Sequence, residues 1–240
     1  MPRKPENPDH NRHPLPDIEV HPWRLCPYGE HSRETHPLHV KPSKKNPNGI
    51  TTRHYHCAKN TDYKDALYPH EIEQIAETHF ASLTGPPKAY DFERPNGNSY
   101  DPFIRGWTRY WNEVLKPAEA LDPDFVKALI FTESSFKVKL FYHTARGLMQ
   151  LVPTAVKALK NYKGELHDHF VILTRNALFD PNLNICGGIR WFFHKKRLRE
   201  IRLKRPVSWL ETVAEYKGRP MDSKEVKIFK EKLAEIKAAK

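Results

Sequence analysis

Glu133 stands where the sequence LDPDFVKALIFTESSF predicts the buried face of a helix. Asp122 is a favourable N-cap and Pro123 suits the first helical position, so this helix is expected to begin here. Apolar residues recur at helical spacing, and the next position on their stripe is the glutamate: Val126, Leu129 and Ile130. A carboxylate on an apolar face is unfavourable unless it is paired or neutralised. Burial favours the protonated carboxyl, which is the form that a general acid needs. The alternative is a structural glutamate that pairs with a basic residue or reaches solvent at the helix end.

Three more motifs follow this helix in order. GLMQLVPTAVKAL begins at residue 147, LFDPNLNICGGIRWF at residue 178 and TVAEYKG at residue 212. Each motif alone is weak, but four short patterns rarely coincide in this order. Over roughly residues 101–220 the arrangement resembles the lytic transglycosylase (SLT) family, which shares a lysozyme-like α-helical fold with goose-type lysozyme. The proline motif, LVPTA, is one residue tighter than the common version of this family.

The resemblance implies a role for Glu133 as the single catalytic acid/base. It would protonate the glycosidic oxygen between N-acetylmuramic acid and N-acetylglucosamine. Most glycosidases use two carboxylates. This family uses one, and the C6 hydroxyl of the muramic sugar attacks to leave a 1,6-anhydro product. The resemblance implies no cofactor for catalysis.

The same resemblance implies a set of substrate-binding residues around the glutamate. They are Ser134, Gly147, Leu148, Met149, Gln150, Tyr216 and Tyr142. Two alternatives stay open for Ser134, which either bonds the substrate or caps a helix end. Tyr142 is expected either to stack on a sugar ring or to pack in the core.

The DPNLNI motif is expected to serve the fold rather than the substrate. Asp180 and Pro181 indicate the start of a helix. Asn184 is expected to bond to neighbouring backbone.

The last motif departs from the family pattern, because Lys217 stands where relatives commonly have asparagine. Lysine has no acceptor, so the sugar contact expected there is lost, and Lys217 would instead pair with carboxylates of the peptide stems. Glu215 is a second unusual carboxylate that would allow hydrolysis by activating water. Helical spacing nevertheless turns residue 215 away from residue 216.

Residues 21–57 contain Cys26, Cys57 and six histidines. Cys26 and His31, together with His56 and Cys57, form two pairs of soft ligands of the kind that a structural Zn²⁺ needs. The spacing fits no standard finger, and a Cys26–Cys57 disulfide or neither arrangement are the alternatives. The third cysteine, Cys186, lies in an apolar helical context and is predicted to be a core residue.

The element pattern predicts a mainly α fold, with a helical domain over residues 69–240 after a flexible tail (1–20) and an irregular His/Cys-containing region (21–68). The family resemblance implies that this helical domain is lysozyme-like. Short strands such as GITTRHYHC are the most that region 21–68 is expected to form. Helical patterns cover 72–83, 101–117, 122–135, 147–160, 182–203, 206–217 and 222–239. Pro117 is expected to end the second of these, and Asp222 to cap the last.

Composition limits the partners. Lysine and arginine exceed aspartate and glutamate by 11, which favours nucleic acid, anionic lipid or an acidic cell-wall polymer. The basic run at residues 195–205 is interpreted as the solvated face of a helix. No run of apolar residues is long enough to span a membrane, and the N-terminus lacks the apolar core of a secretory signal.

The sequence therefore predicts a peptidoglycan-cleaving muramidase that acts on glycan strands at the cell wall or periplasm. Without a signal peptide it would be made in the cytoplasm and exported as a bacteriolytic effector or released as a lysis protein, with an export apparatus, a carrier or an immunity protein as further partners. The alternative function is a catalytically weak wall-binding or adaptor module with a zinc-stapled N-terminal region. A nucleic-acid binder is the least favoured reading, because nothing in the sequence reads bases.

Overall fold

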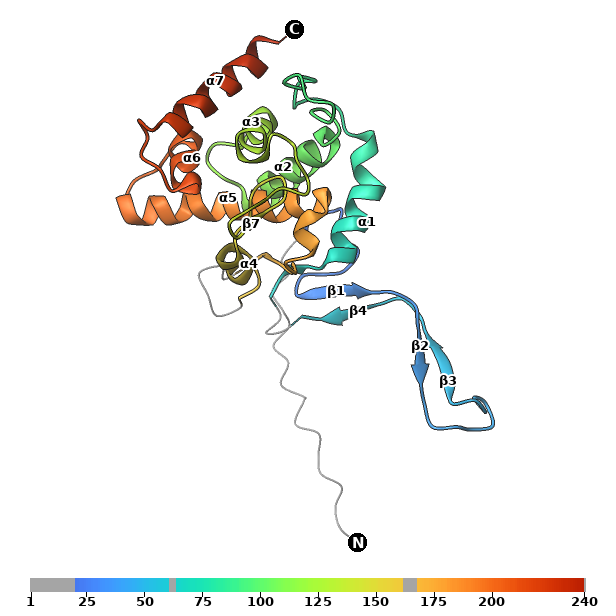
Figure 1. Ribbon diagram of the computed structural model, residues 1–240. Coiled ribbons are helices and arrows are strands. Elements are labelled where there is room, and N and C mark those ends of the chain that lie inside the picture. Colours follow the sequence, from blue (N-terminus) through green and yellow to red (C-terminus); the bar gives the residue numbers. More distant parts are fainter. Residues whose placement is uncertain (1–19, 61–63, 162–167, 240) are drawn as a thin grey trace.

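The computed structural model describes residues 20–60, 64–161 and 168–239, and the tail predicted for residues 1–20 lies, apart from Val20, outside the described residues. The described part of the body is mainly α-helical, as predicted (Figure 1). Its helices are α1 (Pro69–His79), α2 (Asp101–Leu115), α3 (Pro123–Ser134), α4 (Pro153–Leu159), α5 (Pro181–Leu203), α6 (Trp209–Lys217) and α7 (Lys224–Ala238). Short 3-10 turns at Phe80–Ser82 and Ala177–Phe179 complete them.

Helix α5 is the centre of the body and packs against α1, α2, α4 and α6 (Figure 1). Its first half is buried on nearly all sides, which explains why this stretch shows apolar residues without a clear polar face. Two tryptophans of α2 fix it. Trp107 donates to Asn182 Oδ1 at 2.6 Å, and Trp111 donates to the carbonyl of Cys186 at 3.0 Å. Cys186 is fully buried, as predicted, and burial raises the pKa of its thiol.

Helix α3 is held from two sides. On one side α7 packs along it through Val226, Phe229 and Ile236, all fully buried. On the other side the fully buried Lys127 of α3 donates to Asp101 of α2 at 2.9 Å. Because these contacts surround α3, the end of this helix is a rigid place for a functional side chain.

The N-terminal region forms two antiparallel strand pairs in succession. β1 (Glu30–Arg33) pairs with β4 (His56–Lys59), and β2 (His36–His39) pairs with β3 (Ile50–Arg53). The outer pair, with its connecting turn, is called the ribbon (residues 36–53) below, and Figure 1 shows that it extends away from the helices. The prediction of short strands here is confirmed.

This region is anchored to the helical body at its base. Arg24 is buried and pairs with Asp65 at 2.7 Å. Trp23 stacks on His79 of α1 at 5.3 Å between ring centroids. Parallel pairing of β5 (Ala66–Leu67) with β8 (Phe170–Val171) then ties the end of the region to the segment before α5.

Cys26 and Cys57 form a disulfide, which is one of the alternatives left open by the sequence. Their sulfurs are therefore not available as thiolates for a metal. His31 is committed to Asn60 at 2.7 Å, and the ring of His56 bonds the carbonyl of His54. Among the described residues no group of three His, Cys, Asp or Glu side chains is placed to hold a metal, so the zinc hypothesis gains no support.

Several helix boundaries differ from the predictions. α4 begins only at Pro153, because residues 147–151 form a loop and a bridge instead of a first helical turn. α2 ends at Leu115, where Lys116 takes a left-handed conformation before Pro117 is reached. The N-cap of α7 is Ser223 and not Asp222, since the Ser223 hydroxyl accepts from the backbone N–H of Val226. None of the helices in the described ranges is long and apolar enough to cross a membrane.

Candidate active site

Glu133 lies in the last turn of α3. Asp122 caps the start of this helix by accepting from the N–H of Asp124 at 2.9 Å, as predicted. The helix ends because Ser135 adopts φ 49°, a left-handed conformation, and its N–H bonds to Phe131. The apolar stripe before the glutamate is fully buried, whereas the Glu133 side chain is 17% exposed. The carboxyl therefore stands at the edge of the core, where a ligand can reach it.

Lys217 is the partner of this carboxylate. Its Nζ lies 2.5 Å from Glu133 Oε1, and its side chain is only 7% exposed. Lys217 is the last residue of α6, which ends because Gly218 takes a left-handed conformation. The ion pair thus joins the C-terminal ends of two helices, and the sequence motif TVAEYKG reaches the glutamate through its lysine.

Tyr216 lies beside this pair but contacts a different partner. Its hydroxyl donates to the carbonyl of Met149 at 2.6 Å, and its ring packs edge-on against Phe192. Burial, and then the negative charge of Glu133, raise the pKa of Tyr216 well above its usual value. Tyr216 is therefore a neutral donor that joins α6 to the loop carrying Met149.

The GLMQ loop is fixed from behind by Asn184 of α5. The Asn184 amide nitrogen donates to the carbonyls of Arg146 and Leu178, at 3.1 and 2.9 Å, while its oxygen accepts from the N–H of Met149 at 2.8 Å. Gly147 has φ +75°, and a Cβ there would lie 2.1 Å from the Leu178 carbonyl oxygen. Only glycine permits this approach. The expected backbone bonds of Asn184 are confirmed.

Three of the predicted substrate-binding side chains in and near this loop are buried or bonded internally. Leu148 and Met149 are fully buried in the core, so only their backbone can face a ligand. The Gln150 amide donates to the carbonyls of Gly147 and Leu140, at 2.8 and 3.3 Å. Gln150 has φ 47°, a left-handed conformation that is uncommon outside glycine.

Of the remaining candidate residues, one is buried, one is exposed at the surface and one is held in ion pairs. Ser134 is buried and its hydroxyl donates to the carbonyl of Ile130 at 3.1 Å, which favours the helix-end alternative. Tyr142, in the pair β6 (Phe141–Tyr142) and β7 (Ala145–Arg146), is 66% exposed, so it is not a core residue. Glu215 is held by Arg199 and Arg202 of α5, and its carboxylate is directed to that helix.

The pairing of Glu133 with a basic residue was one of the alternatives left open by the sequence, but sequence reasoning did not identify Lys217 as the partner. The signal was present as two anomalies: an acid on an apolar stripe, and a base in place of the family's asparagine. Both are explained if the two residues meet. Of the predicted residues, the structure brings together Glu133, Tyr216 and the GLMQ loop, and it adds Lys217 to them.

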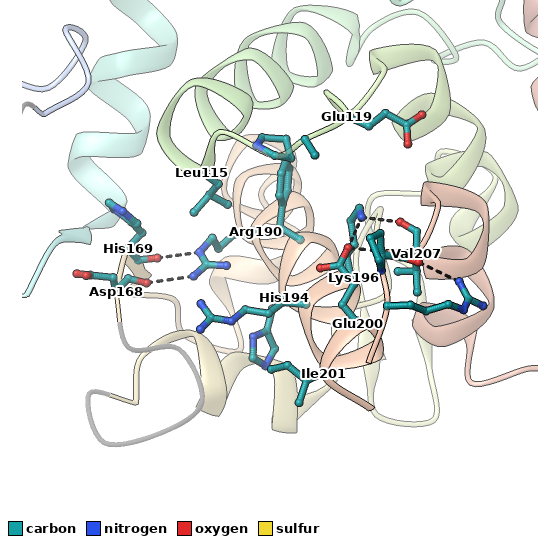
Figure 2. Close-up of a pocket in the computed structure, with 16 residues that line it drawn as sticks. Leu115, Glu119, Asp168, His169, Arg190, His194, Lys196, Glu200, Ile201 and Val207 are labelled. Carbon is teal, nitrogen blue, oxygen red and sulfur yellow. Dashed lines mark hydrogen bonds and ion pairs between the residues drawn. The ribbon is translucent and has the colours of Figure 1, made fainter. Parts of the chain in front are cut away.

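Two cavities show where ligands have room. One, of about 410 Å³, adjoins the end of α3 and is lined by Tyr100, Ser135, Phe136 and neighbouring residues. The other, of about 760 Å³, lies between α5, the α2–α3 connection and the segment before α6 (Figure 2). Its lining includes Arg190 and His194 but not Glu133, Tyr216 or Lys217, so the larger cavity is separate from this site.

The helical body, with Glu133 at the end of a core helix beside the GLMQ loop, agrees with the lysozyme-like fold that the family resemblance implies. The family model for the transglycosylase SLT domain matches residues 110–233, which is more than half of the chain. The chain therefore belongs to the SLT transglycosylase family, whose members are lytic transglycosylases that act on peptidoglycan. No curated protein and no solved structure matches it significantly.

Proposed function

We propose that Glu133 is the single acid/base of a lytic transglycosylase that cuts the β-1,4 bond between N-acetylmuramic acid and N-acetylglucosamine. The observation that carries this proposal is the place of Glu133. It stands partly exposed at the end of a rigid core helix, beside a loop and a tyrosine that match the family's motifs. Exposure lets the carboxyl reach a sugar, and the surrounding core keeps it in position.

The reaction needs one carboxyl group in two states. The protonated Glu133 gives its proton to the glycosidic oxygen as the bond to the muramic C1 breaks. The carboxylate then takes the proton of the muramic C6 hydroxyl, whose oxygen forms the new bond to C1. The products are a 1,6-anhydromuramic end and a free hydroxyl on C4 of the glucosamine, and Glu133 ends protonated again. The ion pairs of Glu215 with α5 support this scheme, because they direct that carboxylate elsewhere.

Charge and the disulfide support action on the wall. Residues 35–56, which include the ribbon, contain no acidic residue but carry Lys41, Lys44, Lys45 and Arg53. A basic arm of this kind favours an anionic polymer. Disulfides persist mainly in oxidising compartments, so the Cys26–Cys57 bond favours a place of action outside the cytoplasm. A bacteriolytic role would follow from the same activity.

The experiment that tests this function is digestion of purified peptidoglycan, with the released fragments weighed by mass spectrometry. We expect anhydro-muropeptides from the natural protein and from Glu215→Gln, which serves as the matched control. Glu133→Gln is expected to lose at least about 100-fold in rate while it keeps a cooperative fold, although its unfolding temperature should fall because Lys217 loses its carboxylate partner. Products heavier by one water, or an active Glu133→Gln, would contradict the single-glutamate scheme. Binding to the wall without any release would favour a catalytically weak wall-binding module instead.

A further inference from the structure

The Glu133–Lys217 ion pair presents a problem for the proposed reaction. A neighbouring ammonium favours the ionised carboxylate, whereas the first step needs a proton on Glu133. At 2.5 Å, and with both side chains largely withdrawn from water, the attraction is strong. In the resting arrangement the Lys217 ammonium therefore occupies the Glu133 oxygen that the glycosidic oxygen would have to reach.

Nothing else in the described part of the site offers Lys217 an alternative acid. Glu215, two residues earlier, is held by Arg199 and Arg202. The Tyr216 hydroxyl is neutral and bonded to the carbonyl of Met149. Because the lysine side chain is only 7% exposed, an ammonium that left Glu133 without a new anion would lose its partner in a poorly hydrated place. An arriving carboxylate removes that cost.

The substrate carries such carboxylates close to the bond that is cut. The peptide stem of peptidoglycan is attached to the lactyl group of the same muramic sugar whose C1 is attacked, and the stem carries free carboxylates. Lysine is a compact charge on a flexible four-carbon chain, so it can exchange one carboxylate for another without movement of α6.

Resting on the proposed function, we propose that Lys217 is a specificity-determining residue that exchanges partners. In the free enzyme its ammonium binds Oε1 of Glu133. A stem-peptide carboxylate draws the ammonium away, and the Glu133 carboxyl is then free to contact the glycosidic oxygen. Strands that carry stem peptides are cut for this reason, and bare glycan strands are cut slowly.

The first test compares intact strands with strands whose peptides have been removed by an amidase. The natural protein is expected to prefer intact strands by about tenfold in kcat/KM. Lys217→Met is expected to cut bare strands faster than the natural protein and to reduce the preference to about twofold or less. Lys227→Met, which removes an exposed charge from α7, is the matched control and should keep the preference. If Lys217→Met slows both substrates equally and keeps the ratio, the lysine merely positions Glu133 and the proposal is wrong.

The second test does not depend on turnover. Glu133→Gln removes the resting partner of Lys217, so it is titrated calorimetrically with a disaccharide-peptide and with the peptide-free disaccharide. Adding Lys217→Met to this variant should weaken binding of the disaccharide-peptide about tenfold and leave the peptide-free disaccharide unchanged. Equal affinities of the two variants for the disaccharide-peptide would overturn the proposal. If the natural protein releases nothing from either strand, the proposed function fails, and this titration still decides the role of Lys217.

Discussion

Gly147 and Asn184 show how single residues shape the site through their contacts with backbone groups. The side-chain amide of Asn184 hydrogen-bonds the carbonyls of Arg146 and Leu178 and the backbone N–H of Met149, and so fixes the GLMQ loop. Gly147 allows the loop to press against the carbonyl of Leu178. Because Tyr216 bonds to Met149 in the same loop, a shift of the loop would also disturb the end of α6.

Gly147→Ala is therefore expected to be severe. Its Cβ would meet the Leu178 oxygen at 2.1 Å and the Asn184 amide nitrogen at 2.4 Å, in addition to the cost of a positive φ. We expect a loss of about 3 kcal/mol in the free energy of unfolding, measured by urea denaturation, together with a large fall in activity.

Gly218→Ala is the matched control for stability. Gly218 has a similar φ of +62°, but a Cβ there would meet nothing within 4 Å. Only the backbone cost of about 1 kcal/mol is expected. Equal losses in the two variants would show that the close approach at Gly147 does not matter.

At the scale of elements, the end of α3 is held by its packing against α2 and α7. The buried pair of Lys127 and Asp101 is the polar part of this packing. Burial raises the pKa of Asp101 to about 6, although the bond from Lys127 opposes the shift. Burial also lowers the pKa of Lys127. Both directions show that removal from water outweighs the mutual attraction, so this pair fixes the geometry at some expense of stability.

The raised pKa of Asp101 predicts a pH dependence of stability. Between its unfolded value of 3.8 and its folded value of about 6, the native state holds a proton that the unfolded chain has released. The stability contributed by Asp101 is complete below about pH 4 and is lost as the pH rises through 6, by about 3 kcal/mol in total. Denaturant unfolding of the natural protein and of Asp101→Asn at several pH values measures this. The difference in free energy of unfolding between the two proteins should fall with rising pH, and a constant difference would contradict the prediction.

Helices were predictable from the sequence where local rules decide them. The N-caps Asp122 and Asp180, followed by proline, and the apolar stripe of α7 follow directly from such rules. The loop before α4 was missed because its glycine and its long-range partner Asn184 override the helical periodicity. Lys217 was not identified as the partner of Glu133 for the same reason: 84 residues separate the two, and no local pattern relates them.

At the scale of the whole molecule, the N-terminal region is built onto the family domain and does not stand apart from it. The family match begins at residue 110, inside α2, yet His21 reaches Glu113 of that helix at 2.8 Å. The buried ion pair between Arg24 and Asp65 also holds the N-terminal region together at its contact with the helical body. The ribbon extends away from this contact, so its basic side chains project from an anchored part of the molecule (Figure 1).

The position and charge of the ribbon predict that it strengthens attachment to anionic wall material. Changing Lys41, Lys44 and Lys45 to Glu reverses three exposed charges on the ribbon, which extends away from the helices (Figure 1). We expect about tenfold weaker cosedimentation with purified walls at low salt, and a smaller difference at high salt, because screening reduces exposed charge interactions. Reversal of Lys224, Lys227 and Lys230, also exposed but on α7, gives the same net charge and is the matched control. If both triple variants lose binding equally, net charge alone attracts the protein to the wall. If only the ribbon variant loses it, while cutting of short soluble strands stays unchanged, attachment belongs to the ribbon and cleavage to the helical body.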